Sequence, residues 1–168
     1  VDVQGKLAQL MVDRDKLYKN IAILVQIANH LGIPILWCQQ SPDALGPTVE
    51  EIRKHLAGHT PLNKQCFSCW QDPGFREKLE ASEARQILLC GIEAHICIYQ
   101  TANDLCFNGF QVEVVLDAIS SRTNDSRALG IQRMMSQGIG GMNVEMALFE
   151  LLKSADHPQF RSLSKLIK

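Results

Sequence analysis

Short apolar runs alternate along the chain with segments in which apolar residues recur every three or four positions. The runs Ile33–Trp37, Ile87–Ile92 and Val112–Leu116 are typical of buried parallel strands. Helical spacing predicts helices between and after them, at residues 13–30, 96–108 and 124–137. Strands that alternate with helices in this way predict an α/β fold in which a mostly parallel sheet lies between helical layers.

Capping residues predict where several helices begin. Asp13 is a good N-cap for the first long helix, and Asp72 is a good N-cap for a short helix that starts at Pro73. Thr48–Glu51 has the pattern of a capping box, and Asn143 is expected to cap the last amphipathic helix, which runs to Lys153. The prolines and glycine of residues 38–47 predict a loop at the carboxyl end of the second strand.

Composition limits the class of protein. A chain of 168 residues with 46% hydrophobic and 21% charged residues fits one domain, residues 1–168. The net charge of −1 and the scattered Lys and Arg residues predict no nucleic acid partner and no membrane partner. The chain shows no targeting segment and no apolar run near the ~20 residues of a membrane span. Six cysteines beside apolar segments predict reduced thiols and a cytoplasmic location.

Cys97 is the main candidate nucleophile. It falls in the first turn of the helix that follows strand Ile87–Ile92, where free backbone N–H groups and the helix dipole favour a thiolate and a lowered pKa. The same N–H groups could hold an oxyanion. Alternatively, Cys97 is a small apolar residue on a helix that also buries Thr101, Ala102, Leu105 and Cys106. Position alone leaves both interpretations open.

Two charged residues are candidates to accompany this thiol. Val1–Gln4 resembles the end of a strand, which would place Asp2 at the carboxyl edge of the sheet, where open α/β sheets bind ligands. Lys64 lies in a segment rich in reactive residue types and could hold a thiolate and orient an acid. The alternatives are a loop-capping Asp2 and a solvated Lys64. Cys66 and Cys69 lack a second pair of metal ligands, so neither a zinc site nor a redox site is predicted there.

Taken together, these residues resemble the isochorismatase-like cysteine hydrolase superfamily across essentially the whole chain. The motifs that carry the resemblance, in order, are Asp2-Val3-Gln4, Lys64 followed by Phe67-Ser68, Gly91-Ile92 before Cys97, Thr101-Ala102, and Asp117-Ala118. The resemblance implies a three-layer αβα fold with a six-stranded, mostly parallel sheet of Rossmann-like order. It also implies a triad in which Cys97 is the nucleophile, Asp2 the general base and Lys64 the stabilising cation.

The resemblance also implies details of the site. It implies a cis peptide bond between Ile92 and Glu93, with N–H groups of Glu93 or Ala94 and of Cys97 facing an oxyanion. A cis bond not preceding proline costs about 3 kcal/mol, and the local sequence alone would not predict one. The candidate pocket residues, which lie beside these motifs or in the loops near residues 39–48 and 66–75, are Gln39, Phe67, Trp70 and His95.

Departures from the family pattern indicate which branch of the superfamily this chain resembles. Nicotinamidases of the superfamily carry an Asp-x-His metal site after the second strand, whereas this chain reads Cys38-Gln39-Gln40-Ser41 there, so we expect no metal and no other cofactor. Isochorismatases that cleave a vinyl ether lack the nucleophilic cysteine, which Cys97 supplies here. Residues 39–48 and 157–160 are most similar to the metal-free branch that includes the isochorismatase-domain-containing proteins.

The resulting expectation is a hydrolase with a cysteine nucleophile that acts on a small-molecule amide or other C–N bond through a covalent thioester. The alternatives are an enol-ether or ester hydrolase on the same fold, or a non-catalytic oligomeric scaffold or regulator. The resemblance further implies a homo-oligomer. The residues do not identify the substrate.

Overall fold

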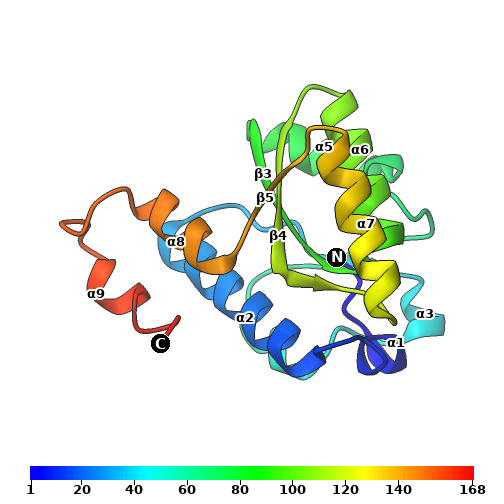
Figure 1. Ribbon diagram of the computed structural model, residues 1–168, viewed down its shortest axis with the longest axis horizontal. Helices are drawn as coiled ribbons and strands as arrows, with labels where there is room; N and C mark the ends of the chain where they lie inside the picture. Colours follow the sequence, from blue (N-terminus) through cyan, green and yellow to red (C-terminus); the bar gives the residue numbers. More distant parts are fainter.

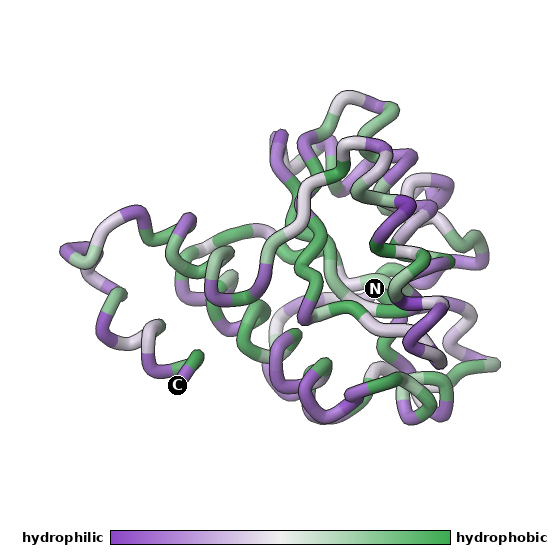
Figure 2. The backbone as a smooth tube through the Cα atoms, in the orientation of Figure 1, coloured by the Kyte–Doolittle hydropathy of each residue, from purple (hydrophilic) through white to green (hydrophobic).

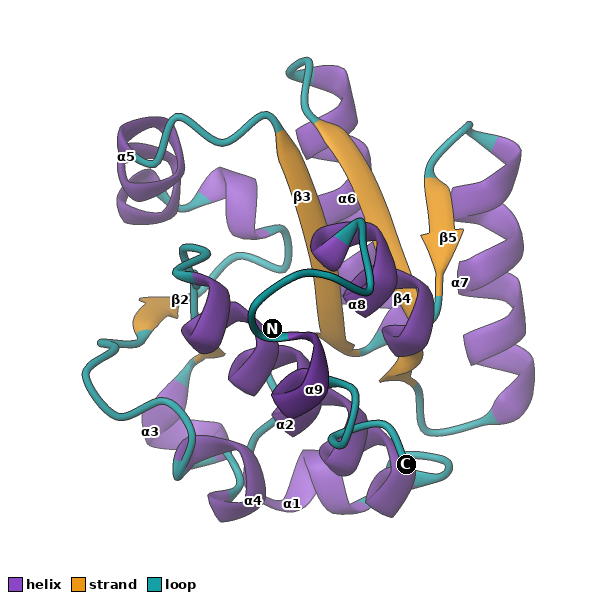
Figure 3. Cartoon of the chain, turned by 90° about the vertical axis from the view of Figure 1, so that its left-hand side faces the viewer, coloured by secondary structure: helices purple, strands orange, loops and turns teal.

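Three parallel strands form the centre of the molecule in the computed structural model, which describes residues 1–168. They lie side by side in the order β3 (Gln86–Ile92), β4 (Gln111–Ser120) and β5 (Gly140–Met142). Helices α6 and α7 cover one face of this sheet and α2 and α8 cover the other (Figures 1 and 3). The bounds of these helices are Arg14–Leu31 for α2, Tyr99–Phe107 for α6, Asn124–Ser136 for α7 and Val144–Leu152 for α8.

A second, two-stranded parallel sheet pairs β1 (Cys38–Gln40) with β2 (Leu62–Lys64). The remaining helical segments are short: α1 (Gly5–Gln9), α3 (Pro42–Leu45), α4 (Glu50–Arg53), the 3₁₀ turn η1 (Cys69–Gln71), α5 (Pro73–Ala81), the π-helical turn η2 (Ala94–Ile98) and α9 (Phe160–Leu163). None of the helices combines the length and the apolar character that crossing a membrane requires.

The N-terminal residues connect the two sheets at the centre of the molecule (Figure 1). The amino group of Val1 donates to Cys90 O at 2.9 Å, and Ile92 N donates to Val1 O at 3.0 Å. On the other side, Asp2 N donates to Cys38 O at 3.1 Å. These bonds place Asp2 between β3 and β1.

Hydrophobic clusters lie on both faces of the three-stranded sheet. Because side chains alternate across a strand, Val114 of β4 faces the cluster under α6 and α7, whereas Val115 faces the cluster under α2 and α8. Strands β3 and β4 are accordingly among the most hydrophobic segments of the backbone, and hydrophilic positions concentrate on outer helices and loops (Figure 2). Burying each large apolar side chain contributes about 1.5–3 kcal/mol.

The α/β architecture with parallel strands is confirmed, but the expected six-stranded sheet is not: the strands form sheets of two and three. The run Ile33–Trp37 was predicted to be a strand. In the structure the strand in this region, β1, begins only after this run. The run's only backbone hydrogen bonds are Ile33 N to Ala28 O and Leu62 N to Trp37 O, so it has no partner along its length. An apolar run identifies a buried segment but does not supply a neighbouring strand.

The predicted caps had mixed outcomes. Asp72 accepts from Phe75 N and Asn143 accepts from Met146 N, which confirms both. Asp13 occupies the N-cap position of α2 as predicted, but its backbone is left-handed and its side chain makes no capping bond. The capping box was wrong. Thr48 Oγ1 instead accepts from Trp37 Nε1 and from the Gln39 side chain, both at 2.9 Å.

Candidate active site

A buried ion pair joins Lys64 to Asp2. Lys64 Nζ donates to Asp2 Oδ2 at 2.6 Å, and the two side chains are only 1% and 2% exposed. The ammonium also donates to Gln40 Oε1 at 2.8 Å and to the carbonyl oxygens of Cys66 and Phe67, each at 3.2 Å. Burial is the largest single influence and lowers the pKa of Lys64, but the charge of Asp2, smaller contributions from Cys69 and Cys97, and the hydrogen bond to Asp2 together raise it. Lys64 is therefore a fixed cation.

Asp2 has an unusual backbone as well as a buried carboxylate. Its φ of 57° lies in the left-handed region, which disfavours a residue with a Cβ by about 1–2 kcal/mol. The bond from Asp2 N to Cys38 O stabilises this conformation. Oδ2 is occupied by Lys64, whereas Oδ1 is buried without a hydrogen-bond partner. The free Oδ1 is an acceptor available to a neighbouring thiol.

The Cys97 thiol is that neighbour. Cys97 lies in η2 directly before α6 and is 7% exposed. Burial raises its pKa to about 12, and the negative charge of Asp2 adds to the effect, while Lys64 opposes it. The expectation of a lowered pKa was wrong. Helix position favours a thiolate, but burial beside a carboxylate favours the protonated thiol.

The loop before η2 has the conformation implied by the resemblance. The peptide bond between Ile92 and Glu93 is cis. The Glu93 carbonyl accepts from Ile96 N at 3.0 Å and Ile98 N at 3.2 Å, which fixes the turn around Cys97. Glu93 N makes no backbone hydrogen bond and remains a free donor in this loop.

The other predicted pocket residues do not form one cluster with the triad. The Gln39 side chain bonds to Thr48. The ring of Trp70 packs edge-on against Phe110 at 5.6 Å, and both side chains pack against the hydrophobic cluster under α6.

Of the remaining two, Phe67 has its backbone carbonyl on Lys64, but its side chain is 55% exposed. His95 lies in η2 beside Cys97, and its Nδ1 is 3.0 Å from Ser121 Oγ. The assignment of Phe67 and His95 to the substrate pocket stays a prediction.

Sequence reasoning missed two supporting glutamines. Gln40 holds Lys64, and the wholly buried Gln4 donates to Gln40 O and Gly46 O and accepts from Gln40 N. Gln40 ends β1, at the same sheet edge that directed attention to Asp2. The position of Gln40 at the end of a strand could have identified it. That position was missed because residues 38–40 were predicted to be part of a loop.

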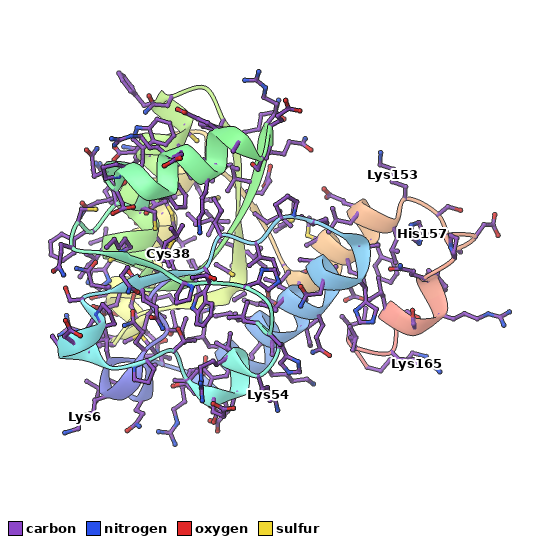
Figure 4. All side chains as sticks on the ribbon, turned by 180° about the vertical axis from the view of Figure 1, so that it is seen from behind. Lys6, Cys38, Lys54, Lys153, His157 and Lys165 are labelled. Carbon is purple, nitrogen blue, oxygen red and sulfur yellow. The ribbon has the colours of Figure 1, made fainter.

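No group of three or more His, Cys, Asp or Glu side chains gathers as metal ligands, and the absence of a cofactor stays a prediction. All six cysteines are free thiols. Cys69 hydrogen-bonds to Cys38, which raises the pKa of Cys38. Figure 4 shows Cys38 in the interior, whereas lysines such as Lys6 and Lys54 point outward.

Two surface hollows lie elsewhere. One of about 420 Å³ is between α2 and α4, and one of about 500 Å³ is on α8. Charged side chains contribute to the lining of both, and neither includes a residue of the predicted triad. The chemistry of the buried residues, rather than the size of these hollows, therefore locates the candidate site.

Comparison with known proteins identifies the family. Residues 1–145 match the isochorismatase domain. Isochorismatase domain-containing protein 2A of Mus musculus is 37% identical over 168 residues, which cover 99% of this chain and 80% of that protein. The MAR1 ribonuclease of Caenorhabditis elegans has a similar structure, with a TM-score of 0.92 and 34% identity over 99% of this chain and 85% of that one.

A more distant structure has the same fold. The YcaC gene product of Escherichia coli, described as an octameric hydrolase of unknown specificity, matches with a TM-score of 0.85 and 21% identity over 96% of this chain and 88% of that one. The match to residues 1–145 and the relative at 37% identity are the stronger findings. The chain therefore belongs to the isochorismatase family, and its fold is that of an isochorismatase-like hydrolase.

Proposed function

We propose that the protein is a cysteine hydrolase that cleaves an amide or other C–N bond of a small molecule. The observation that carries the proposal is the Cys97 thiol beside a carboxylate, Asp2, whose second oxygen is held by the buried ammonium of Lys64. A thiol, a base that can take its proton, and a cation that orients the base are the parts needed for nucleophilic catalysis.

The first step of the proposed reaction is a coupled proton transfer and attack. Because the pKa of Cys97 is raised to about 12, the thiol is protonated at neutral pH. Asp2 Oδ1 takes this proton as Cys97 Sγ bonds to the substrate carbonyl carbon, and the carbonyl π electrons move to its oxygen. Lys64 stabilises the charge that shifts between Asp2 and the sulfur. In this scheme the Cys97 thiolate forms only during attack on the substrate carbonyl.

The oxyanion is the next charge to stabilise. The free N–H of Glu93, together with the N–H of Cys97 or Ala94, is the proposed donor set. When the carbonyl re-forms, the C–N bond breaks and the amine or ammonia leaves with the proton from Asp2. Water, deprotonated by Asp2, then attacks the thioester and releases the acid and the free Cys97 thiol.

The test is turnover coupled to detection of the acyl-enzyme. The full chain is incubated with a panel of small amides, released ammonia is measured, and the intact mass is recorded during turnover. We expect Cys97→Ser to lose at least about 10³-fold in rate and to form no thioester. Cys106→Ser, which changes a thiol outside the triad, is the matched control. An active Cys97→Ser variant would overturn the proposal.

The same assay separates the alternatives. An enol-ether or ester hydrolase would turn over those substrates but no amide. A non-catalytic oligomeric scaffold would turn over none. Because the Caenorhabditis elegans protein of similar structure is named a ribonuclease, RNA is included in the substrate panel. Cleavage of RNA that does not require Cys97 would favour a different active site.

The assembly state is a separate proposal. Because the Escherichia coli neighbour is described as an octamer, we expect this chain to form a homo-oligomer. Sedimentation velocity at micromolar concentration measures this directly, and a monomer throughout the concentration range would contradict it.

A further inference from the structure

The outward face of α8 is apolar at its centre and acidic at its margins. The helix packs against α2 and β4 with its buried face, which leaves the opposite face exposed. On that face Met146 is 47% exposed and Phe149 is 40% exposed, and residues three positions apart are neighbours on a helix. Glu145 and Glu150 join them in lining the hollow on α8. An apolar centre with a charged rim is the usual composition of a surface that binds another protein.

A basic segment lies beside this face. Residues 153–168 carry four basic side chains and one acidic side chain: Lys153, Arg161, Lys165 and Lys168, with Asp156. Gln159 Nε2 donates to His30 O in α2 at 2.8 Å, and the rings of Phe160 and Phe149 are 6.2 Å apart. These contacts hold the basic segment against α2 and α8.

The acidic face and the basic segment share one end of the molecule. Helices α8 and α9 lie together there, on the side away from α6 and α7 (Figures 1 and 3). Lys153 and Lys165 lie at the outside of the same end (Figure 4). Although the two sets of charges are close to each other, no ion pair of the chain includes a residue beyond Arg127. Both sets are therefore available to another molecule.

The chain itself has the composition that this surface requires of a partner. A partner must bring cations to the glutamates of α8 and carboxylates to the basic segment, and a second copy brings both. A two-fold axis places the acidic face of each copy on the basic segment of the other, which is the reciprocal contact of an isologous dimer. The formal net charge of −1 adds little overall repulsion.

We infer that residues 143–168 form the surface through which a second copy of this chain binds in a two-fold arrangement. Met146 and Phe149 form the apolar centre of the contact and supply most of its affinity, because exposed ion pairs contribute little. The charges determine the orientation of the two copies. The inference rests on the proposed homo-oligomer and is independent of the proposed chemistry.

One charge pair can be assigned. Phe149 contacts Phe160, so Glu150 and Arg161, which follow these two residues in the sequence, flank the boundary between the acidic face and the basic segment. A two-fold axis at this boundary brings Glu150 of each copy to the partner's Arg161.

The apolar centre is tested with Met146→Glu. Sedimentation velocity of the full chain over a range of micromolar concentrations gives the dissociation constant, and circular dichroism checks that each variant is folded. We expect Met146→Glu to raise the dissociation constant about tenfold or more. The matched control is Leu129→Glu in α7, where Leu129 is 58% exposed, and it should leave the constant unchanged. Dissociation by Leu129→Glu but not by Met146→Glu would overturn the inference.

The charge pair is tested by mixing two variants. Glu150→Arg alone and Arg161→Glu alone each place like charges opposite one another in both halves of the contact, and each should weaken self-association about threefold or more at low salt. In an equimolar mixture of the two variants, every Glu meets an Arg again, so association should recover. A mixture that associates no better than either variant alone would overturn the assigned two-fold contact.

The outcomes separate the surface from the other proposals. A wild-type chain that stays monomeric would overturn both the inference and the proposed homo-oligomer. An oligomer that Met146→Glu leaves intact would overturn the inference alone. Amide turnover by the same samples tests the proposed chemistry separately, because none of the substituted residues belongs to the predicted triad.

Discussion

Lys64 Nζ lies 2.6 Å from Asp2 Oδ2, and both side chains are almost fully withdrawn from water. Desolvation of two charges offsets much of their attraction, so such a pair adds little net stability. Breaking it is different, because the remaining charge is then buried without compensation. The pair is therefore better explained by its place beside Cys97 than by a need for stability.

Lys64→Met should lower the free energy of unfolding by about 3–5 kcal/mol, since it leaves the Asp2 carboxylate buried and unpaired. Urea denaturation followed by circular dichroism measures this loss. Lys54→Met, at an exposed lysine, is expected within about 0.5 kcal/mol of the wild type. The double variant Asp2→Asn with Lys64→Met should recover most of the loss; if it were additive, the two residues would not act as a pair.

Asp2→Asn should increase alkylation of Cys97 at neutral pH while it abolishes turnover. The carboxylate raises the pKa of Cys97, so its removal lowers that pKa and increases the thiolate fraction, yet removes the proposed base. Lys64→Ala should have the opposite effect on alkylation, because Lys64 lowers the Cys97 pKa. Iodoacetamide labelling quantified by peptide mass spectrometry distinguishes these effects. Reduced labelling in Asp2→Asn would contradict the assigned electrostatics.

The raised pKa of Cys97 predicts a loss of stability at alkaline pH. The folded thiol keeps its proton up to about pH 12, whereas an unfolded thiol releases it near the reference value of 9.0. Its contribution is therefore complete below pH 9 and is lost as pH rises from 9 to 12, by up to about 1.4 kcal/mol per unit. Denaturation at pH 8, 9 and 10 should show a shallower decline for Cys97→Ser than for the wild type. Parallel declines would refute the shift.

Asp72→Ala should destabilise the protein by about 1 kcal/mol, because Asp72 Oδ1 accepts from Phe75 N at the start of α5. Asp13→Ala is the informative comparison. Both residues look like N-caps in the sequence, but Asp13 makes no capping bond, and a change near zero is expected. Thermal or urea unfolding compares the two, and equal losses would show that Asp13 contributes in another way.

Gly130→Ala should destabilise the protein and disturb Cys97. A Cβ at Gly130 would lie 2.8 Å from backbone atoms of His95, so α7 would be pushed away from η2. Helix propensity alone predicts the opposite sign, a gain of about 1 kcal/mol. Ala128→Gly, at an exposed position of the same helix, measures that propensity term. A stable Gly130→Ala variant with normal Cys97 labelling would mean that the contact is not tight.

The alternating pattern of the chain predicted the larger elements because long helices and buried strands have strong periodic signals. Gly32, in a left-handed conformation, ends α2 as expected. The pattern misplaced β1 and overestimated the sheet, because strand pairing depends on a partner distant in sequence. The capping box at Thr48 failed for a related reason: its hydroxyl accepts from Trp37 and Gln39, and no local motif encodes those contacts.

In the candidate site, too, some features were predictable from the sequence and others were not. Strand ends directed attention to Asp2 and Cys97, and the charge of Asp2 is one of the causes that raise the pKa of the Cys97 thiol. The protonation state of Cys97 was not predictable, because it depends on the burial that both groups share. Trp70 was predicted for the pocket from its loop, but its ring packs on Phe110, which only the fold could reveal.

The hydrogen bonds by which Val1 and Asp2 connect the two sheets have a consequence for how the protein folds. The Lys64–Asp2 bond joins residues 62 apart and the Val1–Cys90 bond residues 89 apart, so these contacts are non-local and have a large loop-closure cost. The proposed catalytic site can therefore form only after both sheets have come together around the N-terminal residues. Partial loosening that leaves every helix intact would still separate Asp2 from Cys97, so the chemistry of this protein should report the docking of its two sheets more sensitively than its helix content does.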